Sequence, residues 1–254
     1  MKKALIITLA VLAFLYSTSD SVAGQITKLT EFASTLKGDY GDFYLDGGNL
    51  LKLGAGVAGA GVLANTSADR EFHEYYRDDL KSRTTDNASK LLKLPGEALV
   101  ALPILAGTKI LFEDTVAGPW ADMSLRALLV GGPAGLAIQY AGGGGRPKEG
   151  DSKWRPFKNN NTLSGHAFIG AAPLIVAAKM QDNVCLKGLF YGLSFLPGLT
   201  RINDGEHYIS QVSLGWYLAY LSADKVFKKS GGVSSHVEVL PFKDGAMLSF
   251  SRLF

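Results

Sequence analysis

Long apolar segments, separated by short polar or glycine- and proline-containing stretches, fill most of the sequence between residues 49 and 228. Segments of this length are typical of helices packed around a core. Prolines at 95, 103, 133 and 197 end or kink them. No repeat or internal linker divides these segments, so we predict one all-α domain built as a multi-helix bundle. The predicted apolar helices span 49–64, 87–94, 96–112, 123–139, 165–179, 184–195 and 206–228.

The flanking regions have other patterns. Residues 25–46 are polar and aromatic without a clear apolar period, which predicts a loose lead-in. Thr66, followed three residues later by Asp69, resembles a capping box that opens a polar surface helix. After Gly231-Gly232 come VEVLPF, KDG and AMLSFSRLF, which predict a C-terminal β-hairpin.

The first residues read as a secretory signal peptide. Two lysines precede an apolar run at 4–16, and Ser21-Val22-Ala23 offers a cleavage point before Gly24. The run is short for a membrane span, although an uncleaved anchor is the alternative. We therefore expect a secreted or periplasmic protein. The predicted divisions are 1–23 (signal peptide), 24–95 (lead-in and first helices), 96–230 (helical core) and 231–254 (hairpin).

Composition narrows the functional classes. Of 254 residues, 47% are hydrophobic and 19% charged, which fits a folded domain. The formal net charge is only +3 and no basic block stands out, so nothing indicates nucleic-acid binding. Cys185 is the only cysteine, which excludes an intrachain disulfide. No His, Cys or carboxylate cluster has zinc spacing, and no cofactor is predicted.

A glycine pattern at Gly54–Gly59 matches G-x-G-x-x-G, the dinucleotide fingerprint. That motif needs a preceding strand and a βαβ unit, and neither is predicted here. Small residues that allow two helices to approach closely explain it better. Most apolar runs elsewhere stop before membrane-spanning length, which favours a soluble or membrane-surface-associated domain over an embedded one.

Candidate chemistry lies in three blocks that adjoin predicted core helices. In chain order they are Arg146-Pro147, Ser164-Gly165-His166 and the stretch TRINDGEHYISQ, which contains Arg201, His207 and Gln211. Two guanidinium groups suit bidentate contact with phosphoryl oxygens. The Ser164 hydroxyl and the free N–H groups of a helix starting near Gly165 would add further donors. The blocks therefore predict a cradle for a phosphate group.

The two histidines in these blocks offer complementary roles. His207, near a helix N-terminus that disfavours imidazolium, would attack phosphorus as a neutral ring, and His166 would protonate the leaving oxygen. Gln211 lies one helical turn after His207 and could hold that ring. Taken singly, each residue has a simpler explanation: Ser164 as an N-cap, the histidines as core rings, and Arg201 as a surface charge.

The three blocks together resemble the type 2 phosphatidic acid phosphatase superfamily, which includes bacterial class A acid phosphatases and vanadium haloperoxidases. Its pattern is Lys-x6-Arg-Pro, Pro-Ser-Gly-His and Ser-Arg-x5-His-x3-Asp, and the similarity covers about residues 96–223. The resemblance implies an all-α bundle and metal-independent phosphate-ester hydrolysis through a phosphohistidine. It makes His207 the nucleophile and His166 the general acid, with the phosphate held by Arg146, Ser164, Gly165 and Arg201.

This sequence departs from the pattern at several positions. Gln139 takes the place of the lysine, Leu163 that of the proline, and Thr200 that of the serine. Gln211 takes the place of the aspartate that holds the nucleophile. Lys148-x6-Arg155-Pro156 also fits the first block, but Gln139 ends an apolar helix as the family lysine does, so we prefer Arg146.

The expected function is hydrolysis of a phosphate ester, including a lipid phosphate near a membrane. The two glutamines leave an alternative open, a relative that binds a phosphate or lipid phosphate with weakened chemistry. Replacement of an orienting aspartate by its amide costs about 10⁴ in turnover in a serine protease. A vanadate-dependent peroxidase would share the cradle, but nothing in the sequence favours it.

Overall fold

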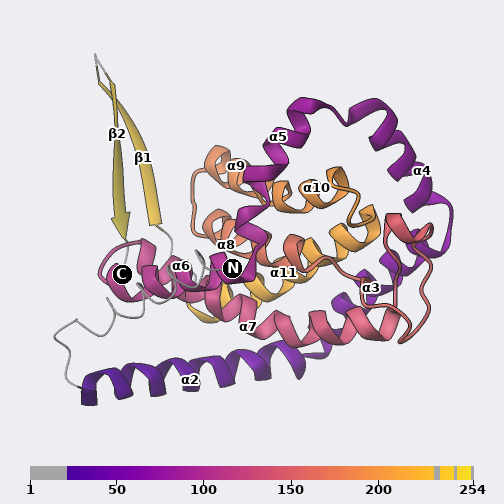
Figure 1. Ribbon diagram of the computed structural model, residues 1–254. Coiled ribbons are helices and arrows are strands. Elements are labelled where there is room, and N and C mark those ends of the chain that lie inside the picture. Colours follow the sequence, from indigo (N-terminus) through magenta and orange to yellow (C-terminus); the bar gives the residue numbers. More distant parts are fainter. Residues whose placement is uncertain (1–21, 232–234, 243–244, 253–254) are drawn as a thin grey trace.

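The computed structural model describes residues 22–231, 235–242 and 245–252 (Figure 1). The predicted signal peptide, apart from Val22 and Ala23, lies outside these residues. The described part is mostly helical, and its core is all-α. Its helices are α2 (Val22–Tyr44), α3 (Gly47–Asn65), α4 (Ala68–Tyr75), the π-helical turn η1 (Tyr76–Leu80), α5 (Arg83–Leu92), η2 (Leu94–Gly96), α6 (Ala98–Leu111), α7 (Ala117–Gly142), η3 (Pro147–Glu149), α8 (Gly165–Lys179), α9 (Val184–Ser194), α10 (Leu196–Asn203) and α11 (Ile209–Lys229).

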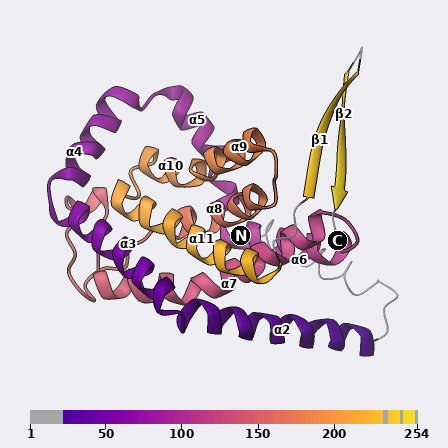
Figure 2. The same ribbon diagram turned by 180° about the vertical axis from the view of Figure 1, so that it is seen from behind.

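Helix α8 lies at the centre of the bundle and packs against α7, α9, α10 and α11 (Figures 1 and 2). Ser164 caps its N-terminus by accepting a hydrogen bond from the Ala167 N–H. Its fully buried residues include Ala171, Ala172, Ile175, Val176 and Ala178. A helix buried to this extent is apolar nearly all round. The first turn of α8 is thereby held rigidly at one end of the core.

Residues 25–46 were predicted as a loose lead-in, and that prediction is wrong. They form most of α2, which lies along α7 (Figures 1 and 2). Leu36, Tyr40, Phe43 and Tyr44 recur at helical spacing and pack on the core. Two glycines and many polar residues obscure this period in the sequence.

Two tyrosine hydroxyls of α2 bond to α7 where Pro133 interrupts it. Pro133 has no N–H, so the Leu129 carbonyl lacks its usual helical partner, and it accepts a hydrogen bond from the Tyr40 hydroxyl at 2.8 Å. The Tyr44 hydroxyl donates to the Val130 carbonyl at 2.7 Å and accepts from the Ala134 N–H at 3.1 Å. Docking of α2 thus satisfies the backbone at the proline of α7.

A buried ion pair also ties α2 to α7. The Arg126 guanidinium donates to both carboxylate oxygens of Asp39, at 2.6 and 2.8 Å, and the two side chains are 5% and 1% exposed. The remaining nitrogen of Arg126 donates to Asp122 and to Ser230, both at 3.1 Å. This bidentate geometry compensates for the burial of both charges.

The predicted capping box at Thr66 and Asp69 is also wrong. The N-cap of α4 is Ser67, whose side chain makes no capping hydrogen bond. Asp69 is fully buried and instead accepts hydrogen bonds from the backbone N–H and hydroxyl of Ser210, at 2.9 and 2.6 Å. A residue that the sequence suggested as a local cap therefore anchors α4 to the start of α11.

The bounds of α8, α10 and α11 can be compared with the helices predicted from the sequence. Helix α8 has the predicted bounds, whereas α10 was not predicted and α11 begins three residues later than expected.

The glycines of the G-x-G-x-x-G match lie inside α3, and a Cβ at Gly56 would come within 2.5 Å of the Tyr217 ring of α11. Along residues 22–231 and both strands, no helix is long and apolar enough to cross a membrane.

Strands β1 (Ser235–Phe242) and β2 (Gly245–Arg252) pair antiparallel at the C-terminal end of the chain. Their register runs from Ser235 opposite Arg252 to Phe242 opposite Gly245.

Candidate functional site

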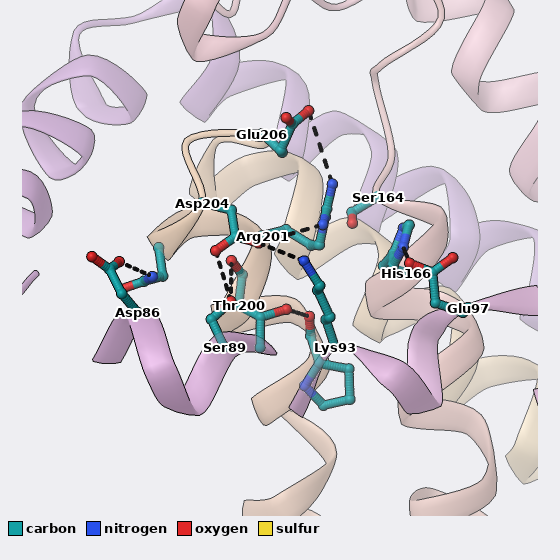
Figure 3. A network of polar contacts seen from close by, with 12 residues as sticks. Asp86, Ser89, Lys93, Glu97, Ser164, His166, Thr200, Arg201, Asp204 and Glu206 are labelled. Atoms are coloured by element: carbon teal, nitrogen blue, oxygen red, sulfur yellow. Dashed lines mark hydrogen bonds and ion pairs between the residues drawn. The ribbon is translucent and has the colours of Figure 1, made fainter. Parts of the chain in front are cut away.

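The candidate site lies where α8 begins, α10 ends and α11 begins. The backbone N–H of Ser164 donates to the carbonyl of Gln211 at 2.9 Å, which joins the start of α8 to the first turn of α11. Figure 3 shows Ser164 and His166 on one side of this region and Arg201 and Glu206 on the other. Residues from three separate sequence blocks therefore meet at one end of the bundle.

The glycine run after α7 brings the first block to this region. Gly143 has a left-handed φ of 63°, and a Cβ there would lie 1.9 Å from the Arg155 carbonyl oxygen, so only glycine fits. Gly144 then donates to the Thr162 hydroxyl at 2.9 Å, and its carbonyl accepts from the Asn161 N–H at 3.2 Å. This turn folds the chain back and directs Arg146 toward α10 and α11.

His207 and Gln211 form a buried, oriented pair. The Gln211 amide nitrogen donates to the Gly145 carbonyl at 2.6 Å, and its oxygen accepts from the Tyr208 N–H at 3.2 Å. These contacts identify the Gln211 atom that lies 2.7 Å from His207 Nδ1 as the oxygen. Nδ1 must therefore carry the hydrogen, which leaves the lone pair of a neutral ring on Nε2.

Burial lowers the pKa of His207 to about 4. This value also includes the hydrogen bond to Gln211, which raises the pKa, and the charges of Arg146, Arg201 and His166, which lower it. The histidine is therefore neutral at pH 7 and well into the acid range. The buried His207 ring thus lies within reach of the charges of Arg146, Arg201 and His166.

The low pKa of His207 predicts a pH-dependent loss of stability. The unfolded ring binds a proton below pH 6.5, whereas the folded ring does so only near pH 4. Between these values the unfolded state binds more protons, so stability falls as pH falls, by about 3 kcal/mol in total from this residue. Urea unfolding of the wild type and His207→Gln at pH 7 and pH 4 measures the difference. An equal loss in both proteins would contradict the prediction.

Arg146 makes its contacts inside the site. Its Nε donates to Asn161 at 2.8 Å, and its Nη1 donates to Glu206 at 2.6 Å. Arg155, the alternative first-block arginine, is half-exposed and pairs with Asp151 at 2.6 Å, four residues away along the loop. The structure therefore places Arg146, not Arg155, next to the third block.

Glu206 occupies the space between the predicted phosphate-binding cations. Besides Arg146, its carboxylate lies 3.5 Å from Lys148 and 3.9 Å from Arg201. Burial tends to raise the pKa of Glu206, but these three cations outweigh it and lower the pKa overall. A resident carboxylate thus lies among the predicted phosphate-binding cations and offsets part of their positive charge. Glu206 was not among the predicted site residues, although it directly precedes His207.

The second block forms the opposite wall of the site. Ser164 is fully buried, and its hydroxyl oxygen serves as the N-cap of α8, which leaves the hydroxyl hydrogen for another acceptor. Gly165 and His166 supply the first N–H groups of α8, which have no partner within the helix. Gln139 donates to the Leu163 carbonyl at 2.9 Å and lies near Gly165, so it supports this wall from behind.

His166 has a carboxylate partner that sequence analysis also missed. Its Nε2 lies 3.0 Å from Glu97, the residue before α6 (Figure 3). The segment before α6 can come this close to α8 because residue 96 is a glycine. Any side chain there would place its Cβ 2.7 Å from the His166 carbonyl oxygen. Glu97 thereby holds the His166 ring at the edge of the site.

An apolar groove of about 220 Å³ begins beside the second block. Gln139 and Gly165 lie at one end of it, and Leu102, Leu136 and Phe168 line its length between α6, α7 and α8. Leu102 and Leu136 are both exposed to solvent, so the groove is open to the surface.

The structure thus brings together all eight predicted site residues, with Gln139 set behind the others. In the described ranges, no group of three or more His, Cys, Asp or Glu side chains is arranged to hold a metal ion. No known family model, curated protein or solved structure matches the chain.

Proposed function

We propose that this protein is a metal-independent phosphatase that hydrolyses a phosphate ester through a phosphohistidine intermediate, on a bundle of the type 2 phosphatidic acid phosphatase kind with a C-terminal hairpin. The main support is the His207 ring. It is neutral, carries its hydrogen on Nδ1 toward Gln211, and lies among Arg146, Arg201 and the N-terminus of α8. A nucleophile for phosphorus needs this tautomer, and the phosphoryl oxygens need these donors.

The proposed reaction has two steps. His207 Nε2 attacks phosphorus, the bond to the ester oxygen breaks, and His166 donates its proton to the departing oxygen. Water then attacks the phosphohistidine, its proton passes to His166, the P–N bond breaks, and inorganic phosphate leaves. Positive charge develops on the His207 ring in the first step, and the Gln211 oxygen stabilises it through the hydrogen bond on Nδ1.

The apolar groove supports a lipid phosphate as substrate. A phosphate in the cradle would lie near Gly165, at the end of the groove where Gln139 also lies. An acyl chain could then extend along the leucines of α6 and α7, with the protein at a membrane surface. The signal-peptide pattern at residues 1–23 supports a reaction outside the cytoplasm.

The purified protein should release phosphate without added metal. We expect hydrolysis of a generic phosphomonoester and of a lipid phosphate in mixed micelles, both in excess chelator. Rapid acid-free quenching followed by peptide mapping should find an acid-labile phosphoryl group on residue 207. Release that requires a divalent cation, or a phosphoryl group on another residue, would contradict the proposal.

The alternative function is a phosphate- or lipid-phosphate-binding protein with weakened chemistry. The observation that favours it is the pair of neutral side chains, Gln139 and Gln211, at positions where the resembling family has Lys and Asp. Neutral Gln211 orients His207 but contributes no negative charge as the ring becomes positive.

The variant Gln211→Asp, alone and combined with Gln139→Lys, distinguishes a phosphatase from a phosphate-binding protein. A carboxylate beside Nδ1 should raise the pKa of His207 above about 4 and increase the rate of the phosphoryl-transfer step. The change also removes the hydrogen bond from Gln211 to Gly145, so we expect about a tenfold to hundredfold gain rather than the full 10⁴ known for triads. Single-turnover phosphate release measures it. Unchanged phosphate affinity with no turnover in any variant would favour the binding protein.

A further inference from the structure

Lys93 lies next to the candidate site although it belongs to none of the three blocks. It follows α5 directly and leads into the short turn η2. That turn packs on α8, where Gly96 approaches the His166 backbone too closely for any side chain. Figure 3 shows the Lys93 side chain extending toward Arg201, on the side that faces Ser164 and His166. The fold thus holds this ammonium group near Arg201 and Asp204.

Lys93 and Arg201 share one carboxylate oxygen. Lys93 Nζ and Arg201 Nη1 each lie 3.7 Å from Asp204 Oδ2. The other oxygen of Asp204 is bound by the Ser89 hydroxyl at 2.7 Å, which fixes the carboxylate in place. At 3.7 Å neither cation makes a full hydrogen bond to Asp204, so both keep donors for another acceptor.

The charges and the incompletely used hydrogen-bond donors of Lys93 and Arg201 favour the binding of an anion between them. Two cations face one carboxylate oxygen, and Arg201 reaches its second carboxylate, Glu206, only at 3.9 Å. The Nε of Arg201 is buried without a hydrogen-bond partner, which is costly for a charged group. The Lys93 side chain is 35% exposed and is carried on a flexible stem, so its ammonium can move toward a ligand.

We propose that Lys93 supplies the phosphate-binding ammonium that Gln139 does not provide. This inference rests on the proposed phosphate site and extends it with a residue from another helix. The ammonium would contact phosphoryl oxygens beside Arg201. Lys93 is 46 positions before Gln139, so no motif spacing relates the two residues.

The test compares affinities for inorganic phosphate and for orthovanadate by calorimetry. Lys93→Met should weaken both by about tenfold to a hundredfold, as for loss of one charge-assisted hydrogen bond. Lys93→Arg should stay within a few-fold of wild type. Lys90→Met is the matched control, since Lys90 is exposed one turn earlier on α5 and bonds to Asn87. Lys93→Gln replaces the methionine variant if that protein does not fold.

The outcomes separate this inference from the proposed function. Phosphate release with an unchanged KM and an unchanged phosphate affinity in Lys93→Met would overturn the role of Lys93 and leave the phosphatase intact. Phosphate binding that depends on Lys93, without any turnover, would support Lys93 and overturn the phosphatase. A wild-type protein that binds neither anion would overturn both.

Discussion

His207→Ala is expected to lower the rate of phosphate release by at least about a thousandfold, because the variant lacks the atom that forms the covalent intermediate. The reason is local geometry. Gln211 and the Gly145 carbonyl fix the tautomer that leaves Nε2 free, and neither can act on phosphorus itself. Steady-state release from p-nitrophenyl phosphate and from a phosphorylated alcohol measures the loss, and it should be equally complete for both substrates.

His166→Ala provides the matched comparison. A general acid contributes about 10²–10⁴ when the leaving group is a poor one. For an alcohol, loss of His166 should therefore be severe, whereas p-nitrophenolate leaves without protonation and should be affected far less. Circular dichroism would verify that both variants fold. If His207→Ala retained wild-type activity, or if the two histidines responded in the same way to the leaving group, the assigned roles would be wrong.

Asp39→Ala is expected to destabilise the protein by about 3–5 kcal/mol, since it leaves the Arg126 charge buried without its bidentate partner. Both side chains are almost inaccessible, so water cannot replace the missing carboxylate. Asp122 and Ser230 contact only one nitrogen of the guanidinium and cannot compensate. Urea unfolding followed by circular dichroism measures the change.

Two further variants separate loss of the charge pair from loss of packing. Asp39→Leu with Arg126→Met removes both charges and should recover much of the stability, because no buried charge is left unpaired. Asp151→Ala breaks the exposed pair with Arg155 and should change stability by roughly 0–1 kcal/mol. If Asp39→Ala were as mild as Asp151→Ala, the buried pair would have no structural role.

Local signals account for the elements that the sequence predicted well. Helix α8 has the predicted bounds because Ser164 is a strong cap and an uninterrupted apolar run follows it. Helix α2 was missed because only a few of its residues pack on the core, and Tyr40 and Tyr44 are aromatic residues that also suit loops. Helix α10 was missed because it has only eight residues, contains Pro197 in its first turn and ends at a polar turn.

The order of the three sequence blocks along the chain was enough to predict that they form one site. It did not predict which other side chains contact them. His166, Arg201 and His207 could be grouped because phosphate chemistry needs such side chains together. Glu97 and Lys93 could not, because they come from segments that approach α8 only through packing of α5, η2 and α6. Glu206 was visible in the sequence, yet its position among the cations depends on how the glycine turn directs Arg146.

The contacts between α2 and α7 have a consequence for evolution. At Pro133, three backbone groups of α7 depend on two hydroxyl groups carried by a different helix. A homologue in which this proline is replaced by an ordinary residue regains the missing amide and no longer needs the tyrosine at position 40. Positions 40 and 133 should therefore covary, with the phenol kept under selection wherever the imino acid is present.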